Sequence, residues 1–134
     1  MEVLDDFQAN YQSDRHGKTW IAQMLGHCAC RNFLSVAYCR FPQLLEALED
    51  AVLHRTSVSL RKRLSGRNLL IIDEFGLGQF SERTRSDFLS LIDERVAFAS
   101  TIIVSQIPIK GWHEFIGEAY SADTLADRLV QGSL

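Results

Sequence analysis

The feature that most constrains the fold is a short aliphatic run that ends in two carboxylates. The run over 69–72 (LLII) is followed directly by Asp73 and Glu74. A strand without a polar position is typical of a parallel sheet whose two faces are covered by helices. Carboxylates at the carboxyl end of such a strand lie where open α/β sheets place their ligands. The run therefore predicts a buried parallel strand that stops at Asp73, with a ligand site at that end.

Strand-like and helical patterns alternate along the rest of the chain. Further strands are predicted over 34–41 and 101–104, where β-branched and aromatic residues are concentrated. Apolar residues at helical spacing predict helices over 19–31 and 43–54, in turns around Leu60 and Leu64, after an N-cap at Ser81, and over 112–116 and 121–131. Helices between short apolar strands imply βαβ crossovers and a parallel sheet.

The first predicted helix carries an apolar stripe. Ile21, Met24, Leu25 and Cys28 recur at i, i+3, i+4 and i+7, so we expect this face to be buried. The Cys28–Cys30 pair could form half of a metal site, but no second ligand pair follows at zinc-finger spacing. Buried, reduced cysteines are the expectation.

Composition excludes several classes of protein. The chain has 134 residues, of which 46% are hydrophobic and 23% charged, too apolar for a disordered chain and of a length usual for one domain. Its longest aliphatic run has four residues, far below the ~20 that span a bilayer, and no basic-then-apolar signal opens it. We expect a soluble, cytoplasmic protein with no membrane partner.

A basic cluster interrupts a chain whose formal net charge is −3. No acid lies between Asp50 and Asp73, and that interval contains five cations: Arg55, Arg61, Lys62, Arg63 and Arg67. Such a patch can attract phosphate from nucleic acid or nucleotide. A solvated helix face is the alternative interpretation.

A second motif stands immediately before the first helix. Gly17, Lys18 and Thr19 match the end of a phosphate-binding loop, in which glycine frees backbone N–H groups, lysine neutralises phosphate and the hydroxyl ligates magnesium. The usual first glycine of that loop is replaced by Gln12. We therefore regard the loop as damaged.

Two further positions could belong to the same site. Ser105 and Gln106 end the strand predicted over 101–104, beside the expected place of Asp73. Either could contact a γ-phosphate or an attacking water, or both could simply be a polar strand end. Arg128 could act as an arginine finger toward a neighbouring subunit, or pair locally with Asp123 or Asp127.

With these residues assembled, the chain resembles the IstB-like ATP-binding proteins of insertion sequences, relatives of the DnaC helicase loaders within the AAA+ ATPases. The resemblance rests on four segments: 17–19 (GKT), 69–76 (LLIIDEFG), 101–117 (TIIVSQIPIKGWHEFIG) and 122–130 (ADTLADRLV). It implies a P-loop NTPase fold of the AAA+ type, with a parallel sheet and flanking helices. The family motif that contains Trp112 and His113 is expected to pack rather than to catalyse.

The resemblance also implies roles for single residues. Gly17, Lys18 and Thr19 would bind ATP, Thr19 and Asp73 would hold Mg²⁺, and Glu74 would be catalytic. Gln106, with Ser105, would match sensor 1, and Arg128 the finger arginine. ATP hydrolysis is implied if the site is intact despite the altered loop.

The same resemblance implies a partial domain. Residues 1–16 would be an aberrant segment in place of the glycine-rich loop and first strand, and 17–134 a partial AAA+ domain. The AAA+ strand order is 5-1-4-3-2, so the readable strands would form the contiguous 4-3-2 portion. The first and last core strands, 1 and 5, would be missing or aberrant. Strand 4 would then be an exposed edge, which favours self-association or instability.

Family members hydrolyse ATP while assembled on DNA and assist a transposase in using its target site. This chain would be such a transposition helper, a homo-oligomer on DNA contacted through Arg61, Lys62 and Arg63 in a salt-sensitive manner. A degenerate, non-hydrolysing remnant that only binds DNA or protein is the alternative. A plain α/β interaction module, in which Asp73 and Glu74 bind nothing, is a third possibility.

Overall fold

The computed structural model describes residues 2–3, 17–96, 98–107, 111–112 and 115. In chain order the elements are β1 (Glu2–Val3), α1 (Gly17–Arg31), β2 (Val36–Arg40), α2 (Phe41–Leu53), α3 (Ser57–Ser65), β3 (Leu69–Phe75), α4 (Glu82–Val96) and β4 (Ser100–Ser105). The alternation of strands and helices predicted over 19–104 is confirmed. The helix predicted over 121–131 and most of that over 112–116 lie outside the described residues.

The strands form a parallel sheet in the order β1-β2-β3-β4. Tyr38 of β2 is in register with Ile71 of β3, which in turn is in register with Ile102 of β4. The helices α2 and α3 connect β2 to β3, and α4 connects β3 to β4. The predicted contiguity of these three strands is therefore confirmed.

The described part of the N-terminal segment joins the sheet at the edge opposite β4. Glu2 and Val3 pair with Ala37 and Tyr38 of β2. Among the described residues, β4 has β3 as its one neighbouring strand. The edge of β4 is thus open within the part of the chain that the structure describes.

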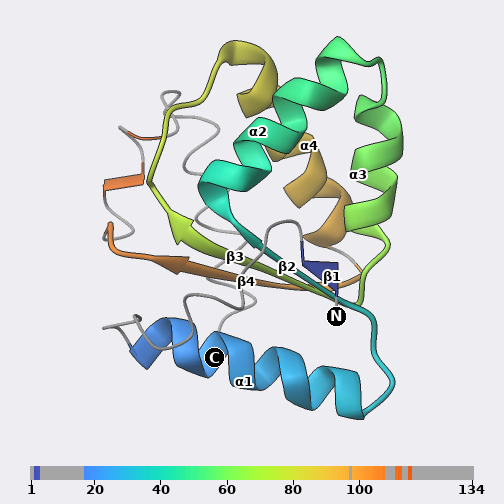
Figure 1. Ribbon diagram of the computed structural model, residues 1–134, viewed down its shortest axis with the longest axis vertical. Helices are drawn as coiled ribbons and strands as arrows, with labels where there is room; N and C mark the ends of the chain where they lie inside the picture. The colour runs from blue at the N-terminus through green and yellow to red at the C-terminus, as the bar shows by residue number, and fades with distance from the viewer. Residues whose placement is uncertain (1, 4–16, 97, 108–110, 113–114, 116–134) are drawn as a thin grey trace.

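Helices cover both faces of the sheet, with α1 on one side and α2, α3 and α4 on the other (Figure 1). The side chains alternate accordingly along each strand. Tyr38 and Ile71 belong to the smaller hydrophobic cluster with Ala22 of α1. Cys39 and Ile72 belong to the larger cluster with α2, α3 and α4.

Aromatic rings fill the centre of the larger cluster. The ring of Phe41 makes edge contacts with those of Phe75 and Phe88, at centroid distances of 4.9 and 5.7 Å. Trp112 is buried against Phe75, and its indole N–H donates to the carbonyl of Ile107 at 3.0 Å. The packing role predicted for Trp112 is confirmed, whereas His113 lies outside the described residues.

The stripe predicted to be buried on α1 is instead exposed. Ile21, Met24 and Leu25 are 54%, 41% and 49% exposed, and Cys28 is exposed as well. The helix faces the sheet with small or polar residues: Thr19, Ala22, Gln23 and Gly26. These residues also recur at helical spacing, and small side chains allow the helix to lie close to the strands, so hydrophobicity alone selected the wrong face.

Two other predictions about burial need correction. Cys39 is buried as expected, but Cys28 is exposed and Cys30 is only half-buried. Val96, at the end of α4, is 46% exposed, although Phe88 and Ile92 of the same helix are buried.

Within the described residues, none of the helices combines the length and apolar character needed to cross a membrane.

Candidate functional site

The centre of the candidate site is a contact between α1 and β3. The hydroxyl of Thr19, in the first turn of α1, donates to Oδ1 of Asp73 at 3.1 Å. Thr19 is 9% exposed and Asp73 2% exposed. Residues 54 positions apart in the sequence are therefore joined at the carboxyl end of β3.

Two more donors hold the Asp73 carboxylate. The phenolic hydroxyl of Tyr38, on β2, donates to Oδ2 at 2.5 Å, and the backbone N–H of Glu74 donates to Oδ1 at 2.8 Å. Hydrogen bonds to a charged carboxylate are stronger than those between neutral groups. Asp73 is thus fixed by donors from α1, β2 and β3 itself.

Tyr38 remains protonated under ordinary conditions. Burial raises the pKa of Tyr38 well above its usual range, and the hydrogen bond to Asp73 and its negative charge raise the pKa further. The hydroxyl is therefore a permanent donor to the carboxylate. No sequence signal pointed to this role, because Tyr38 is one aromatic residue in an apolar strand.

β3 was predicted to stop at Asp73. In the structure it continues through Phe75. The ladder with β4 is irregular between Ile72 and Phe75, and Glu74 has a φ of +57°. This irregularity allows Phe75 to rejoin the ladder opposite Ser105 and to enter the core. Glu74 is half-buried directly beside Asp73.

A glycine follows this strand for a steric reason. Gly76 has a φ of +107°, and a Cβ there would lie 2.2 Å from Cδ1 of Ile107. A residue with a side chain would be both strained and in collision. The Gly76 position thus keeps the chain after Glu74 close to the end of β4.

Lys18 is exposed in the first turn of α1. A helix N-terminus carries a partial positive charge, which together with a lysine favours phosphate. The predicted loop around Gln12, which precedes α1, lies outside the described residues. The described part of the motif therefore places Lys18 and Thr19 at one helix end, with Thr19 against Asp73.

Ser105 and Gln106 differ in their surroundings. The hydroxyl of Ser105 donates to the carbonyl of Phe75 at 2.8 Å and accepts the backbone N–H of Ile107 at 3.0 Å. Ser105 therefore fastens the ends of β3 and β4 together. Gln106 follows β4 and is exposed, and Arg128 lies outside the described residues.

The basic triplet on α3 does not form one surface. Arg61 is only partly exposed and turns toward α4, where its guanidinium lies 3.7 Å from a carboxylate oxygen of Asp87 and 3.8 Å from one of Glu94. Lys62 and Arg63 are exposed. Arg61 thus pairs with acids of α4, and a DNA-binding role for the triplet stays a prediction.

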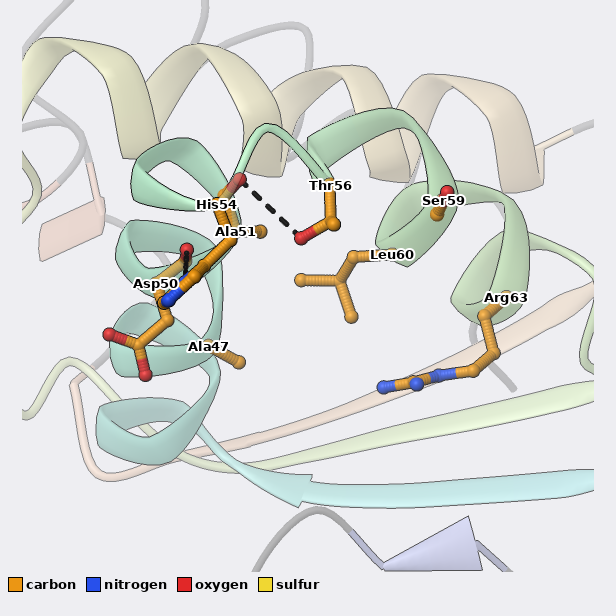
Figure 2. Close-up of a pocket in the computed structure, with 8 residues that line it drawn as sticks. All are labelled: Ala47, Asp50, Ala51, His54, Thr56, Ser59, Leu60 and Arg63. Atoms are coloured by element: carbon orange, nitrogen blue, oxygen red, sulfur yellow. Dashed lines mark hydrogen bonds between the residues drawn. The ribbon is translucent and has the colours of Figure 1, made fainter.

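Arg63 lies at a hollow between α2 and α3 (Figure 2). Ala47, Ala51 and Leu60 supply apolar lining, and the remaining lining residues are Asp50, His54, Thr56 and Ser59. The ring Nδ1 of His54 lies 2.8 Å from the carbonyl oxygen of Asp50. This hollow is on the α2 and α3 side of the sheet, away from the Thr19–Asp73 contact on the α1 side.

Thr19 and Asp73 have the chemistry that Mg²⁺ requires. Magnesium prefers oxygen ligands and usually retains water and substrate phosphate in its shell, with one or two carboxylates from the protein. A hydroxyl and a carboxylate satisfy that pattern. The described residues contain no cluster of three His, Cys, Asp or Glu side chains that would hold a metal ion by themselves.

Solved structures of replication proteins share this fold. The AMPPCP-bound DnaA from Aquifex aeolicus matches with a TM-score of 0.73 at 22% identity, over 88% of this chain and 36% of that one. A crystal structure of DnaI matches with a TM-score of 0.75 at 15% identity, over 88% and 65%. The fold is that of the AAA+ P-loop ATPase domains, as predicted.

Sequence comparison then assigns the family. The model of the IstB-like ATP binding proteins matches residues 13–133, and this chain belongs to that family. It is 42% identical over 117 residues to y4pL of Sinorhizobium fredii and 38% identical to y4uH of the same organism, both named for insertion sequences and ATP binding. The chain spans about half the length of these curated relatives, 48% and 47%.

Proposed function

We propose that this chain binds ATP together with Mg²⁺ at the Thr19–Asp73 contact and serves as an ATP-binding helper in the transposition of an insertion sequence. Family membership supports the role in general. One observation carries the site: the 3.1 Å hydrogen bond that joins the first turn of α1 to the end of β3. That contact unites the two predicted magnesium ligands.

Each residue of the site has a proposed task. Lys18 binds the outer phosphates, and Thr19 and Asp73 hold the magnesium, which offsets phosphate charge during the reaction. Glu74, beside Asp73, orients the attacking water if the chain hydrolyses ATP. Gln106 and Arg128 remain proposals for sensing and for completing the site of a neighbouring subunit.

Lysine substitution tests the nucleotide site. In Lys18→Ala, we expect ATP affinity in the presence of Mg²⁺ to fall about tenfold or more, because loss of a phosphate contact removes a charge-assisted bond. Lys62→Ala is the matched control, since it removes an exposed lysine from α3. Equal affinities for the two variants, measured by titration calorimetry, would exclude Lys18 from the site.

DNA binding is the second part of the proposal. Lys62 and Arg63 are exposed on α3 and are suited to phosphate contacts. We expect affinity for duplex DNA to fall with rising salt, and the double variant Lys62→Ala, Arg63→Ala to have a shallower salt dependence than Arg83→Ala on α4. Equal salt slopes would remove α3 from the DNA interface.

A transposase partner and a homo-oligomer on DNA belong to the same proposal.

The non-hydrolysing remnant remains a second candidate. In the AAA+ strand order, strand 1 lies beside strand 4, which corresponds to β4. Glu2 and Val3 instead pair with β2, at the other edge of the sheet, and this observation favours a site without its usual first strand. This candidate requires DNA or protein binding that ignores ATP. A DNA affinity that changes on addition of ATP and Mg²⁺ would reject this candidate. A DNA affinity that nucleotide does not change, together with no measurable ATP binding, would favour it over the ATPase.

A further inference from the structure

The orientation of the Asp73 carboxylate determines which oxygen it presents to a cation. Asp73 is almost fully buried near the end of β3, and in the proposed function it binds magnesium there. A carboxylate can rotate about its side-chain bonds, and a rotated carboxylate would present different oxygens to the ion. Thr19 and the Glu74 N–H both donate to Oδ1, so these two donors leave Oδ2 to another partner.

Tyr38 supplies that partner from a different strand. Its hydroxyl donates to Oδ2 at 2.5 Å. The ring stands on the α1 side of β2, where it belongs to the hydrophobic cluster with Ala22 and Ile71. Because the ring is 1% exposed and packed on that side, the position of its hydroxyl is set by the core.

A buried amide lies behind the phenol. Gln23, on α1, is 5% exposed. Among the described residues, Nε2 of Gln23 has no hydrogen-bond partner. Thr19 and Gln23 are one helical turn apart on α1, and Ala22 between them packs in the same cluster as Tyr38, so one helix borders both Asp73 and the phenol that holds it.

We propose that Tyr38 is a positioning residue, whose hydroxyl holds the Asp73 carboxylate in the orientation that receives the magnesium ion of bound ATP. This inference rests on the proposed function and assigns to the site a residue on β2. Partners that orient a metal ligand commonly change metal affinity by about 10- to 100-fold when removed. Tyr38 should therefore affect the magnesium dependence of nucleotide binding more than binding itself.

Tyr38→Phe tests the inference, since it removes the hydroxyl and retains the ring. Binding of a fluorescent ATP analogue is titrated with MgCl₂, and separately measured in EDTA. We expect the magnesium concentration for half-maximal enhancement to rise roughly tenfold in Tyr38→Phe, with a smaller change in the metal-free affinity. Circular dichroism verifies that each variant is folded.

Thr84→Val is the matched control. Thr84 is 1% exposed, and its hydroxyl accepts the N–H of Ser81 at 2.9 Å at the start of α4, on the opposite side of the sheet from α1. The substitution removes another buried hydroxyl without contact to Asp73. We expect its magnesium half-point to equal that of the unmodified chain.

The outcomes separate the two proposals. If magnesium increases nucleotide binding by the unmodified chain, but Tyr38→Phe and Thr84→Val have the same magnesium half-point, the positioning role is wrong and the proposed nucleotide site is unaffected. If Tyr38→Phe lowers metal-free affinity as much as it raises the magnesium half-point, Tyr38 has only a structural role and the inference is also wrong. If the unmodified chain binds nucleotide without any magnesium effect, the proposed magnesium site fails and the inference fails with it.

Discussion

Arg95 joins α4 to the end of α3 and to β4. Its side chain is 1% exposed and donates to the carbonyls of Leu64 and Arg67, at 2.7 and 2.8 Å, where α3 ends. Its Nε donates to the hydroxyl of Thr101 on β4 at 2.9 Å. Burial lowers the pKa of Arg95 to about 10, so the guanidinium remains charged near neutral pH. Nothing in the sequence distinguishes Arg95 from the solvated arginines of the chain.

Substitution of Arg95 should be costly. Arg95→Met leaves several buried carbonyls without a donor, and we expect the free energy of unfolding to fall by about 3 kcal/mol. Arg83→Met is the control: Arg83 is 63% exposed and pairs with Asp87, and we expect the loss of this solvent-screened pair to cost about 1 kcal/mol or less. Urea unfolding followed by circular dichroism measures both. Similar values for the two variants would show that Arg95 does not hold these elements together.

Tyr38 should make the free energy of unfolding depend on alkaline pH. In the unfolded chain the phenol loses its proton near the ordinary value of 10, whereas the folded state raises the pKa of Tyr38 by burial and retains the proton. The contribution is therefore fully present below pH 10 and is lost as the pH rises above it.

Comparison with Tyr38→Phe isolates this contribution, because all other titrating groups are common to both chains. Above pH 10 we expect the unmodified chain to lose up to about 1.4 kcal/mol per pH unit more than the variant. Urea unfolding between pH 8 and 11 gives the two slopes. Parallel slopes would mean that Tyr38 titrates in the folded state as it does in the unfolded one.

At the scale of elements, the exposed face of α1 can be tested against the face predicted from the sequence. Leu25→Ala should change the free energy of unfolding by no more than about 0.5 kcal/mol, since Leu25 is 49% exposed. Leu44→Ala on α2 should cost about 2–5 kcal/mol, because Leu44 is 0% exposed. If the two variants lose equal amounts, the stripe that contains Leu25 is buried after all.

Elements that bury large aliphatic residues were predictable, and elements that bury small ones were not. The LLII run of β3 and the leucines of α2 left one interpretation, which the structure confirms. On α1, Ala22 and Gly26 recur at helical spacing on one face, and larger apolar residues recur at the same spacing on another. Periodicity alone cannot show which of the two faces packs against the sheet. The irregularity at Glu74 depends on where Phe75 packs, which a single strand pattern does not contain.

At the scale of the whole molecule, the arrangement of the candidate site was partly predictable. Thr19 and Asp73 were predicted to share a magnesium site, and the parallel topology brings them into contact, because α1 begins at the edge where β3 ends. Tyr38 and Gln23 were missed, since their roles depend on which strand faces which helix. The pairing of Arg61 could not be predicted, because Asp87 and Glu94 come from α4, far along the chain.

The measurement that tests the central claim most directly is ATP binding with and without magnesium, by titration calorimetry, in the unmodified chain and in Asp73→Asn. We predict that Mg²⁺ increases the affinity of the unmodified chain at least about tenfold, and that Asp73→Asn loses most of that increase. Millimolar affinity that neither Mg²⁺ nor Asp73→Asn changes would contradict the account, because the Thr19–Asp73 contact would then be structural and not a nucleotide site.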